Sequence, residues 1–133
     1  GDGTMSTEIK SDAWYTKEDE WIIVTGDEAT IGVTDYAQDS LSDIVYLELP
    51  AEGDAFEIGD SFGVVESVKA AADLMMPIGG QVLAVNEDLM DEPENINSEP
   101  YESWLIKIKV SDPAELEQLM DAAAYEVYCN ERE

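Results

Sequence analysis

The sequence predicts a mainly β fold, a small β-sandwich or flattened barrel that carries short helices. Runs of β-branched and aromatic residues recur at short intervals, and Gly, Asp and Pro turn signals separate them. The chain has 133 residues, of which 44% are hydrophobic, which suits one core and one domain. Apolar segments with glycines also lie on both sides of residues 66–73, a weak symmetry that suits two stacked sheets.

Up to residue 68, strand-like runs follow one another and one short helix interrupts them. The expected strands are 21–24, 29–33, 44–49, a short segment between turns at 52–54 and 58–60, and 61–68. The last strand has the period of two typical of a half-buried strand, with Phe62 and Val64 among the residues of one face. Thr34 and Asp35 carry side-chain oxygens that can cap a helix over 36–41.

Beyond residue 68 the chain turns and resumes its strand-like pattern. The expected features are a turn, extended segments at 71–78 and 81–86, a long acidic surface loop over 86–101, and a strand over 104–110. The turn is preferred to a helix because three alanines are far short of the roughly 12 residues that an isolated helix needs. The loop is expected because Pro93 and Pro100 cannot join a ladder. Lys107 and Lys109 should face water.

Two helices are expected at the carboxyl end. Asp112 supplies an N-cap, Pro113 suits the first turn, and Glu115 is placed to complete a capping box. The apolar residues that these helices are expected to pack against the core are Leu116, Leu119 and Met120 in the first, and Tyr125, Tyr128 and Cys129 in the second.

The charge balance restricts the partners. The chain has 32 acidic and 6 basic residues and no histidine, so its formal net charge is -26. Such a surface repels nucleic-acid phosphates and anionic lipid, so we expect neither nucleic acid nor membrane as a partner, and basic protein surfaces instead. The acidity itself has two interpretations, a surface kept soluble by charge or an adaptation to high salt.

The composition also excludes most catalytic and metal chemistry. Without histidine, nucleophilic triads have no general base, and with Cys129 as the one cysteine a zinc site is implausible. No calcium-loop motif occurs, and among 32 carboxylates no pair stands out as a general acid and base. We therefore expect no catalytic site and no dedicated metal site, while adventitious cation binding at residues 88–92 stays open.

The organisation of the chain is expected to be simple. Residues 1–4 have the character of an expression scar, residues 5–13 complete a flexible lead-in, and residues 14–133 form one domain. No apolar run approaches the roughly 20 residues of a membrane span, and no secretion signal is evident. A single cysteine suits a reducing compartment, so a cytoplasmic location is expected.

One lysine has a distinctive setting. Between Lys17 and Lys107 the only cation is Lys69, and the turn expected there exposes it to a modifying enzyme. Glu66 and Asp73 are expected to keep its ammonium group charged. A nucleophilic amine would need a lowered pKa, so Lys69 is interpreted as a covalent attachment point and not as a nucleophile. The residues alone also leave open a surface lysine without a role.

The segment around Lys69 resembles the lipoyl-attachment segment of the glycine cleavage system H proteins. The similarity runs in order from about Trp14 to Tyr128. The segments that carry it are 15–18, 20–21, 29–38, 43–45, 48–50, 62–71, 77–78 with Gly80, 91–93, 96–97, 100–101, 104–109 and 124–125.

The resemblance implies a carrier and not an enzyme. Its fold would be the barrel-sandwich hybrid of lipoyl and biotinyl carriers, and lipoate would be amide-linked to Lys69 on an arm on the order of 10 Å long. The implied partners are a pyridoxal-phosphate glycine decarboxylase that loads an aminomethyl group, a tetrahydrofolate-dependent aminomethyltransferase that removes it, a dihydrolipoyl dehydrogenase, and a lipoate ligase or lipoyl transferase. The implied state is a monomer, in the cytoplasm or, in a eukaryote, in the mitochondrial matrix.

The resemblance also implies roles for residues near Lys69. Those expected to be recognised by the ligase and other partners are Glu66, Ser67, Val68, Ala70 and Asp73. The loaded arm would rest in a surface cleft near Glu20, Ser40 and Asp73. Gly63 and Gly80 would frame the hairpin. The sequence departs from the family at Asp19, where the family commonly has histidine, and at Ser40, where some members have a bulkier residue.

Other functions stay open at this stage. A lipoyl module of a 2-oxo acid dehydrogenase, or a protein that relays lipoate, would share Lys69 but use different partners. Biotin carriage is disfavoured because Val68 and Ala70 stand where biotin carriers have methionines. An acidic protein that mimics nucleic acid would explain the charge but leave Lys69 without a role.

Overall fold

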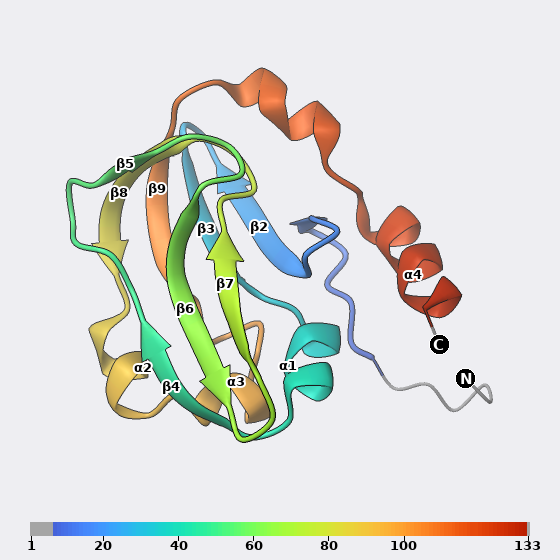
Figure 1. Cartoon of the computed structure of the whole chain (residues 1–133). Helices are drawn as coiled ribbons and strands as arrows, with labels where there is room; N and C mark the ends of the chain where they lie inside the picture. The colour runs from blue at the N-terminus through green and yellow to red at the C-terminus, as the bar shows by residue number, and fades with distance from the viewer. Residues whose placement is uncertain (1–6, 133) are drawn as a thin grey trace.

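Two antiparallel β-sheets lie face to face, and short helices cover their ends (Figure 1). The structure is a computed structural model that describes residues 7–132, so the expected scar at 1–4 lies outside it. Its elements are β1 (Trp14–Tyr15), β2 (Glu20–Thr25), β3 (Glu28–Val33), α1 (Asp35–Leu41), β4 (Ile44–Glu48), β5 (Ala55–Phe56), β6 (Ser61–Ser67), β7 (Ala71–Met75), β8 (Gly80–Val85), α2 (Glu87–Asp91), α3 (Asn95–Ser98), β9 (Ile106–Val110), the 3₁₀ helix η1 (Pro113–Gln118) and α4 (Ala122–Glu131).

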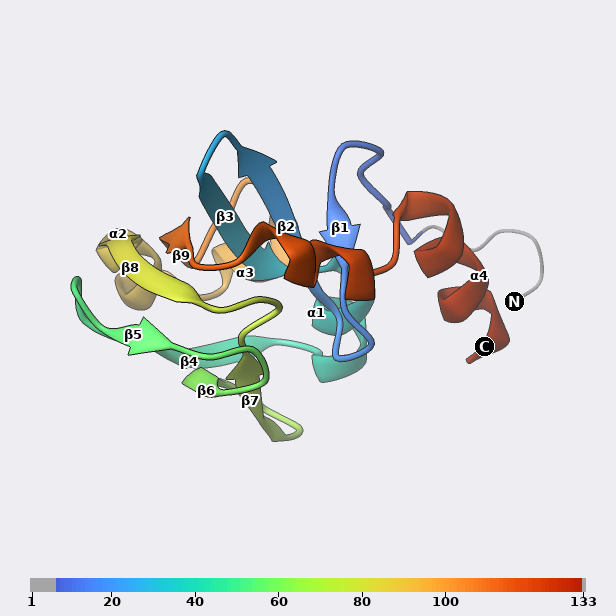
Figure 2. The ribbon, with the colours of Figure 1, turned by 90° about the horizontal axis from the view of Figure 1, so that it is seen from above.

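The larger sheet has the strand order β1-β2-β3-β9-β8-β5, and the smaller has the order β4-β6-β7. Figure 2 shows the two layers edge-on. Neither sheet closes on itself, so the predicted sandwich is confirmed and the fold is not a closed barrel. Apolar side chains from both sheets, such as Ile31 and Ile108 from one and Leu47 and Val65 from the other, fill the space between the layers.

Local signals place the first elements where the sequence predicted them. Strands β2 and β3 pair through a turn in which Gly26 has a φ of 65°, a conformation that costs glycine little. Helix α1 begins after Thr34, whose hydroxyl accepts a hydrogen bond from the amide of Ala37 at 3.1 Å. In β6 a bulge between Ser61 and Gly63 shifts the alternation, so that Phe62 and Val65 are buried.

A second, aromatic core lies beside the sandwich and holds α4. Tyr15 and Tyr125 stack with ring centroids 4.3 Å apart, and both are fully buried. Cys129 is also buried, and burial raises the pKa of its thiol. The predicted packing role of Tyr125 and Cys129 is therefore confirmed, while Tyr128 is half-buried and donates its hydroxyl proton to the carbonyl of Lys17 at 2.9 Å.

The long acidic loop predicted over residues 86–101 is wrong in part, because this segment contains α2 and α3. Its acids face water, whereas Leu89 and Ile96 are buried in the core. Pro93 lies between the two helices and is itself buried, so it separates them without breaking either. Each helix is too short to show a periodic apolar face in the sequence.

The first carboxyl-terminal helix also differs from its prediction, since it is a 3₁₀ helix. Asp112 caps it as expected and accepts a hydrogen bond from the amide of Ala114 at 3.0 Å. Glu115, however, accepts a hydrogen bond from the amide of Gly79 at 2.8 Å and not from the N-cap. The predicted capping box is therefore wrong, because the carboxylate of Glu115 accepts its hydrogen bond from a distant backbone amide instead of the N-cap amide. No helix among the described residues is long and apolar enough to cross a membrane.

Candidate functional site

The hairpin of β6 and β7 places Lys69 on its turn, at the end of the molecule that also carries α1 and α3 (Figure 1). The side chain of Lys69 is exposed, as predicted. Its Nζ donates a hydrogen bond to the carbonyl oxygen of Ser40 in α1, at 3.3 Å. An exposed contact of this kind is weak, so the amine remains accessible from solvent.

The hydroxyl of Ser67 organises the turn. Its Oγ accepts hydrogen bonds from the amides of Lys69 and Ala70, at 3.1 and 3.0 Å, and donates to the carbonyl of Ala70 at 3.1 Å. The amide of Val68 donates to the carbonyl of Asp43 at 2.9 Å, which ties the turn to the start of β4. The backbone beneath Lys69 is therefore held on both sides. The sequence indicated Ser67 as a recognition residue but did not reveal this bonding.

The two acids expected beside Lys69 are both exposed. Glu66 pairs with Ala71 across the hairpin, and Asp73 pairs with Val64. Within residues 7–132 neither carboxylate lies within 4.0 Å of the lysine amine. The attraction between these carboxylates and the Lys69 amine therefore acts across solvent, where salt screens it.

Gly63 and Gly80, expected to frame the hairpin, lie at close approaches between strands. A Cβ on Gly63 would collide with the carbonyl oxygen of Glu48 in β4. One on Gly80 would lie 2.5 Å from the carbonyl oxygen of Lys109 in β9. Both positions need glycine because the neighbouring backbone leaves no room for a side chain.

We expect Gly63→Ala to lower the free energy of unfolding by about 2 kcal/mol, because β4 must move away from β6 to admit the methyl group. Urea denaturation followed by circular dichroism measures the change. Gly79→Ala is the matched comparison, because its new Cβ would lie 3.3 Å from the nearest atom, a tight contact that needs a much smaller shift, so its loss of stability should be smaller. Equal stability of Gly63→Ala and the wild type would contradict this account.

Glu20 is buried at the boundary between the sheets. Its side chain is on β2, is 2% exposed, and accepts hydrogen bonds from the Thr16 hydroxyl at 2.6 Å and from the amide of Met75 at 3.2 Å. It therefore ties the larger sheet to β7, an edge strand of the smaller sheet. Desolvation by burial raises the pKa of Glu20 to about 8.

The three residues expected at the parking cleft lie in different settings. Glu20 reaches β7 at Met75, Asp73 is exposed two residues earlier on the same strand, and Ser40 is exposed on α1 with its carbonyl against Lys69. No direct hydrogen bond joins Glu20, Ser40 and Asp73 to one another among the bonds of residues 7–132. A cleft that uses all three stays a prediction.

A separate hollow of about 550 Å³ opens at the far end of β7, and none of those three residues lines it. Its walls come from the segments 15–18, 58–59, 75–77 and 118–120. Met75, whose amide binds Glu20, belongs to this wall. The hollow is mostly apolar, and it lies at the opposite end of β7 from the Lys69 turn.

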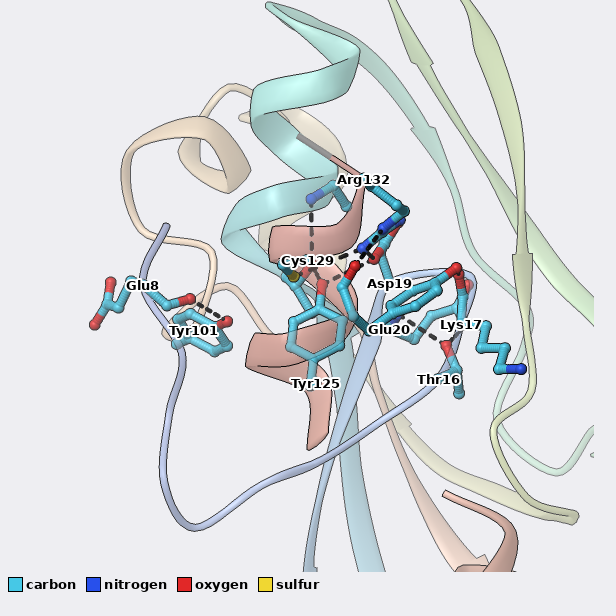
Figure 3. A network of polar contacts seen from close by, with 12 residues as sticks. Glu8, Thr16, Lys17, Asp19, Glu20, Tyr101, Tyr125, Cys129 and Arg132 are labelled. Atoms are coloured by element: carbon cyan, nitrogen blue, oxygen red, sulfur yellow. Dashed lines mark hydrogen bonds and ion pairs between the residues drawn. The ribbon is translucent and has the colours of Figure 1, made fainter. Parts of the chain in front are cut away.

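Asp19, the residue before Glu20, is the centre of a polar network that the sequence did not predict (Figure 3). Its backbone has a φ of 71°, and its carboxylate accepts two hydrogen bonds from Arg132, at 2.7 and 3.0 Å. The hydroxyl of Tyr125 donates to the same carboxylate at 2.8 Å. The network therefore joins the end of α4 to the turn that precedes Glu20.

Aromatic rings enclose the guanidinium group in this network. The Cζ atom of Arg132 lies 3.9 Å from the ring centroid of Tyr36 in α1 and 3.9 Å from that of Tyr128 in α4. The hydrogen bonds to Asp19 raise the pKa of Arg132 despite its partial burial. This one arginine thus joins α1, α4 and the Asp19 turn.

We expect Arg132→Gln to lower the free energy of unfolding by about 2 kcal/mol, because it leaves the carboxylate of Asp19 without its cation. Lys10→Gln is the matched control, since it removes a 3.9 Å ion pair with Asp12 whose members are 39% and 63% exposed. Chemical denaturation of both variants checks the difference. A loss of equal size in the two variants would show that burial of the Arg132 pair contributes nothing.

Fold and site together define a class of protein. Two open sheets that present one lysine on the turn of an exposed hairpin are the architecture of a carrier domain of the lipoyl and biotinyl type. A protein-family model described as "Glycine cleavage H-protein" matches residues 13–132. The chain belongs to this family, whose members are lipoyl carriers of the glycine cleavage system.

Individual relatives agree with the family model. The glycine cleavage system H protein of Anaeromyxobacter sp. (strain K) is 52% identical over 127 residues, which cover 95% of this chain and 99% of that protein. The H protein of Acidobacterium capsulatum is 53% identical over 117 residues, with 88% and 91% covered. The crystal structure of an H protein from Mycobacterium marinum superposes with a TM-score of 0.82 at 33% identity and covers 93% of this chain and 98% of that one.

Proposed function

We propose that Lys69 carries lipoate in amide linkage and that the chain presents this arm in turn to the enzymes of glycine cleavage. The observation that carries the proposal is one exposed lysine on a hairpin turn whose backbone is held by Ser67 and by the carbonyl of Asp43. Such a turn fits the group, because the amine is free to react while its base keeps a defined position. When bound, lipoate supplies a disulfide that can accept and release an aminomethyl group.

The chain's own part in the cycle is positioning. A held turn fixes the root of the arm, so the carried group explores a small volume and meets each active site at a high effective concentration. We assign recognition of the turn by the lipoate ligase or lipoyl transferase to Glu66, Ser67, Val68, Ala70 and Asp73. Glu66, Val68, Ala70 and Asp73 are exposed, which supports this assignment.

We propose further that the loaded arm rests between α1 and β7, near Glu20, Ser40 and Asp73. Two contacts support this location: Lys69 already reaches the carbonyl of Ser40, and Glu20 already binds β7. The exposed carboxylate of Asp73 suits an aminomethyl cation. Glu20 would add a second negative charge once it loses its proton, at a pH near 8.

The proposed partners are a pyridoxal-phosphate glycine decarboxylase, an aminomethyltransferase and a dihydrolipoyl dehydrogenase. A net charge of -26 favours partners whose docking surfaces are basic. Catalysis would then belong to these partners and transport to this chain, because the chain has no histidine and its one cysteine is buried.

Reconstitution with purified glycine decarboxylase tests the function. The lipoylated protein is expected to support the release of carbon dioxide from carboxyl-labelled glycine and to gain the mass of one aminomethyl group. The unlipoylated protein is the control and should do neither. A lipoylated protein that is inactive with the decarboxylase but accepts acyl groups from a 2-oxo acid dehydrogenase would overturn the proposal.

A further inference from the structure

Three large apolar side chains are exposed around the Lys69 turn. Val45 is 56% exposed, Tyr46 is 47% exposed and Val68 is 69% exposed. Val68 precedes Lys69, and its amide is bonded to the carbonyl of Asp43, two residues before Val45. We call Val45, Tyr46 and Val68 the turn patch.

A β-bulge in β4 creates this patch. Ile44 pairs with Ser67 and Tyr46 pairs with Glu66, so Val45 is an extra residue in the ladder. As a result Val45 and Tyr46 are both exposed, while Ile44 and Leu47 on either side of them are buried. A regular strand would alternate and turn one of the two toward the core.

The position of the patch connects it to Lys69. Directly paired residues share one face of a sheet, so Tyr46, Glu66 and Ala71 form a row across the outer face of the three-stranded sheet. Glu66 lies three residues before Lys69 and Ala71 two residues after it. The apolar side chains of the turn patch are exposed and do not pack into the hydrophobic core. Exposed apolar clusters of this kind mark interaction surfaces.

The geometry of acylation selects the partner. To form an amide at Nζ, an enzyme must bring its activated acyl carbon within bonding distance of Lys69 itself, and its surface must then cover the neighbouring side chains. Enzymes that act on the lipoyl end reach it through an arm on the order of 10 Å long and need not cover them. In that step the Nζ–carbon bond forms and the bond from the acyl carbon to its leaving group breaks, with its electron pair leaving on that group. The ammonium group of Lys69 loses two of its three protons, and the third stays as the amide N–H.

We infer that the turn patch is the docking surface for the enzyme that acylates Lys69, an inference that rests on the proposed function. Exposed carboxylates of Asp43, Glu48 and Glu66 surround the apolar centre. The matching surface on the enzyme therefore has an apolar centre with a basic rim. Tyrosine is a common anchor at such centres because its ring buries a large area.

The test is the rate of lipoylation by a purified lipoate ligase with ATP and lipoate, followed by intact mass. The variant is Val45→Thr combined with Tyr46→Thr, since threonine keeps the strand propensity of both exposed positions. We expect kcat/KM to fall about tenfold, mainly through a higher KM. Val127→Thr is the matched control, because Val127 is also 56% exposed but lies on α4, and its kcat/KM should stay within about twofold of the wild type.

The outcomes distinguish a failure of the turn-patch inference from a failure of the proposed function. Variant protein that has been lipoylated to completion is expected to support decarboxylation of glycine within about twofold of the wild type. An unchanged kcat/KM for lipoylation, or an equal fall in Val127→Thr, would overturn the role of the patch alone. Loss of glycine decarboxylation with normal lipoylation would instead assign the patch to the decarboxylase. A wild-type protein that the ligase does not modify would overturn both inferences.

Discussion

Lys69→Arg is expected to abolish lipoylation and, with it, all carrier activity. Arginine keeps the positive charge, but its guanidinium group stays protonated at any physiological pH and offers no free amine for acylation. Intact mass after incubation with ligase, ATP and lipoate should rise by one lipoyl group in the wild type and stay unchanged in the variant. Circular dichroism should show the same fold, because Lys69 is exposed and the one described hydrogen bond of its side chain is 3.3 Å long.

Two further lysines make this experiment specific. Lys107→Arg and Lys109→Arg replace exposed lysines on β9, away from the hairpin turn, and both variants should be lipoylated as the wild type is. A lipoyl group found on Lys107 or Lys109, or on Lys69→Arg itself, would show that the attachment point has been misplaced.

Glu20→Gln is expected to remove a pH dependence of several kcal/mol. The pKa of Glu20 is raised in the folded protein from 4.5 to about 8, mainly because burial penalises its charge. Between these two values the folded state binds more protons than the unfolded state. The free energy of unfolding of the wild type therefore falls as the pH rises through this window, by on the order of 5 kcal/mol in all. Below pH 4.5 Glu20 is protonated in both the folded and the unfolded state, so it does not lower the free energy of unfolding.

The difference in the free energy of unfolding between the wild type and Glu20→Gln reports on Glu20 alone, because the other acids are the same in both proteins. Glutamine can accept from the amide of Met75 and donate to Thr16, so Glu20→Gln should match the wild type near pH 5 and be more stable near pH 8.5. Urea denaturation at the two pH values measures this. Glu87→Gln removes a carboxylate from an exposed position on α2 and should keep the wild-type slope. Parallel pH profiles of the wild type and Glu20→Gln would refute a raised pKa at this site.

Some of the fold follows from short stretches of sequence. The Gly26-Asp27 turn, the Thr34 cap and the hairpin around Lys69 each depend on residues a few positions apart, and the structure has all three. The exposed Lys107 and Lys109 were predictable for the same reason, because side chains alternate along any strand. The helices over 87–91 and 95–98 were missed because each buries a single apolar side chain, too few to form a pattern.

At the candidate site, too, the sequence predicted the local features and the tertiary structure alone gave the long-range contacts. By itself the sequence determined an acidic chain with one isolated lysine on a turn between two strands, because strand periodicity and turn chemistry act locally. Only the tertiary structure decided that Glu20 binds the amide of Met75, 55 positions away, and that Asp19 binds Arg132, 113 positions away. It also decided that Val45 and Tyr46 are exposed together beside Lys69, since a bulge depends on the register between two strands. Such contacts join residues that no short-range pattern relates, so packing alone brings them together.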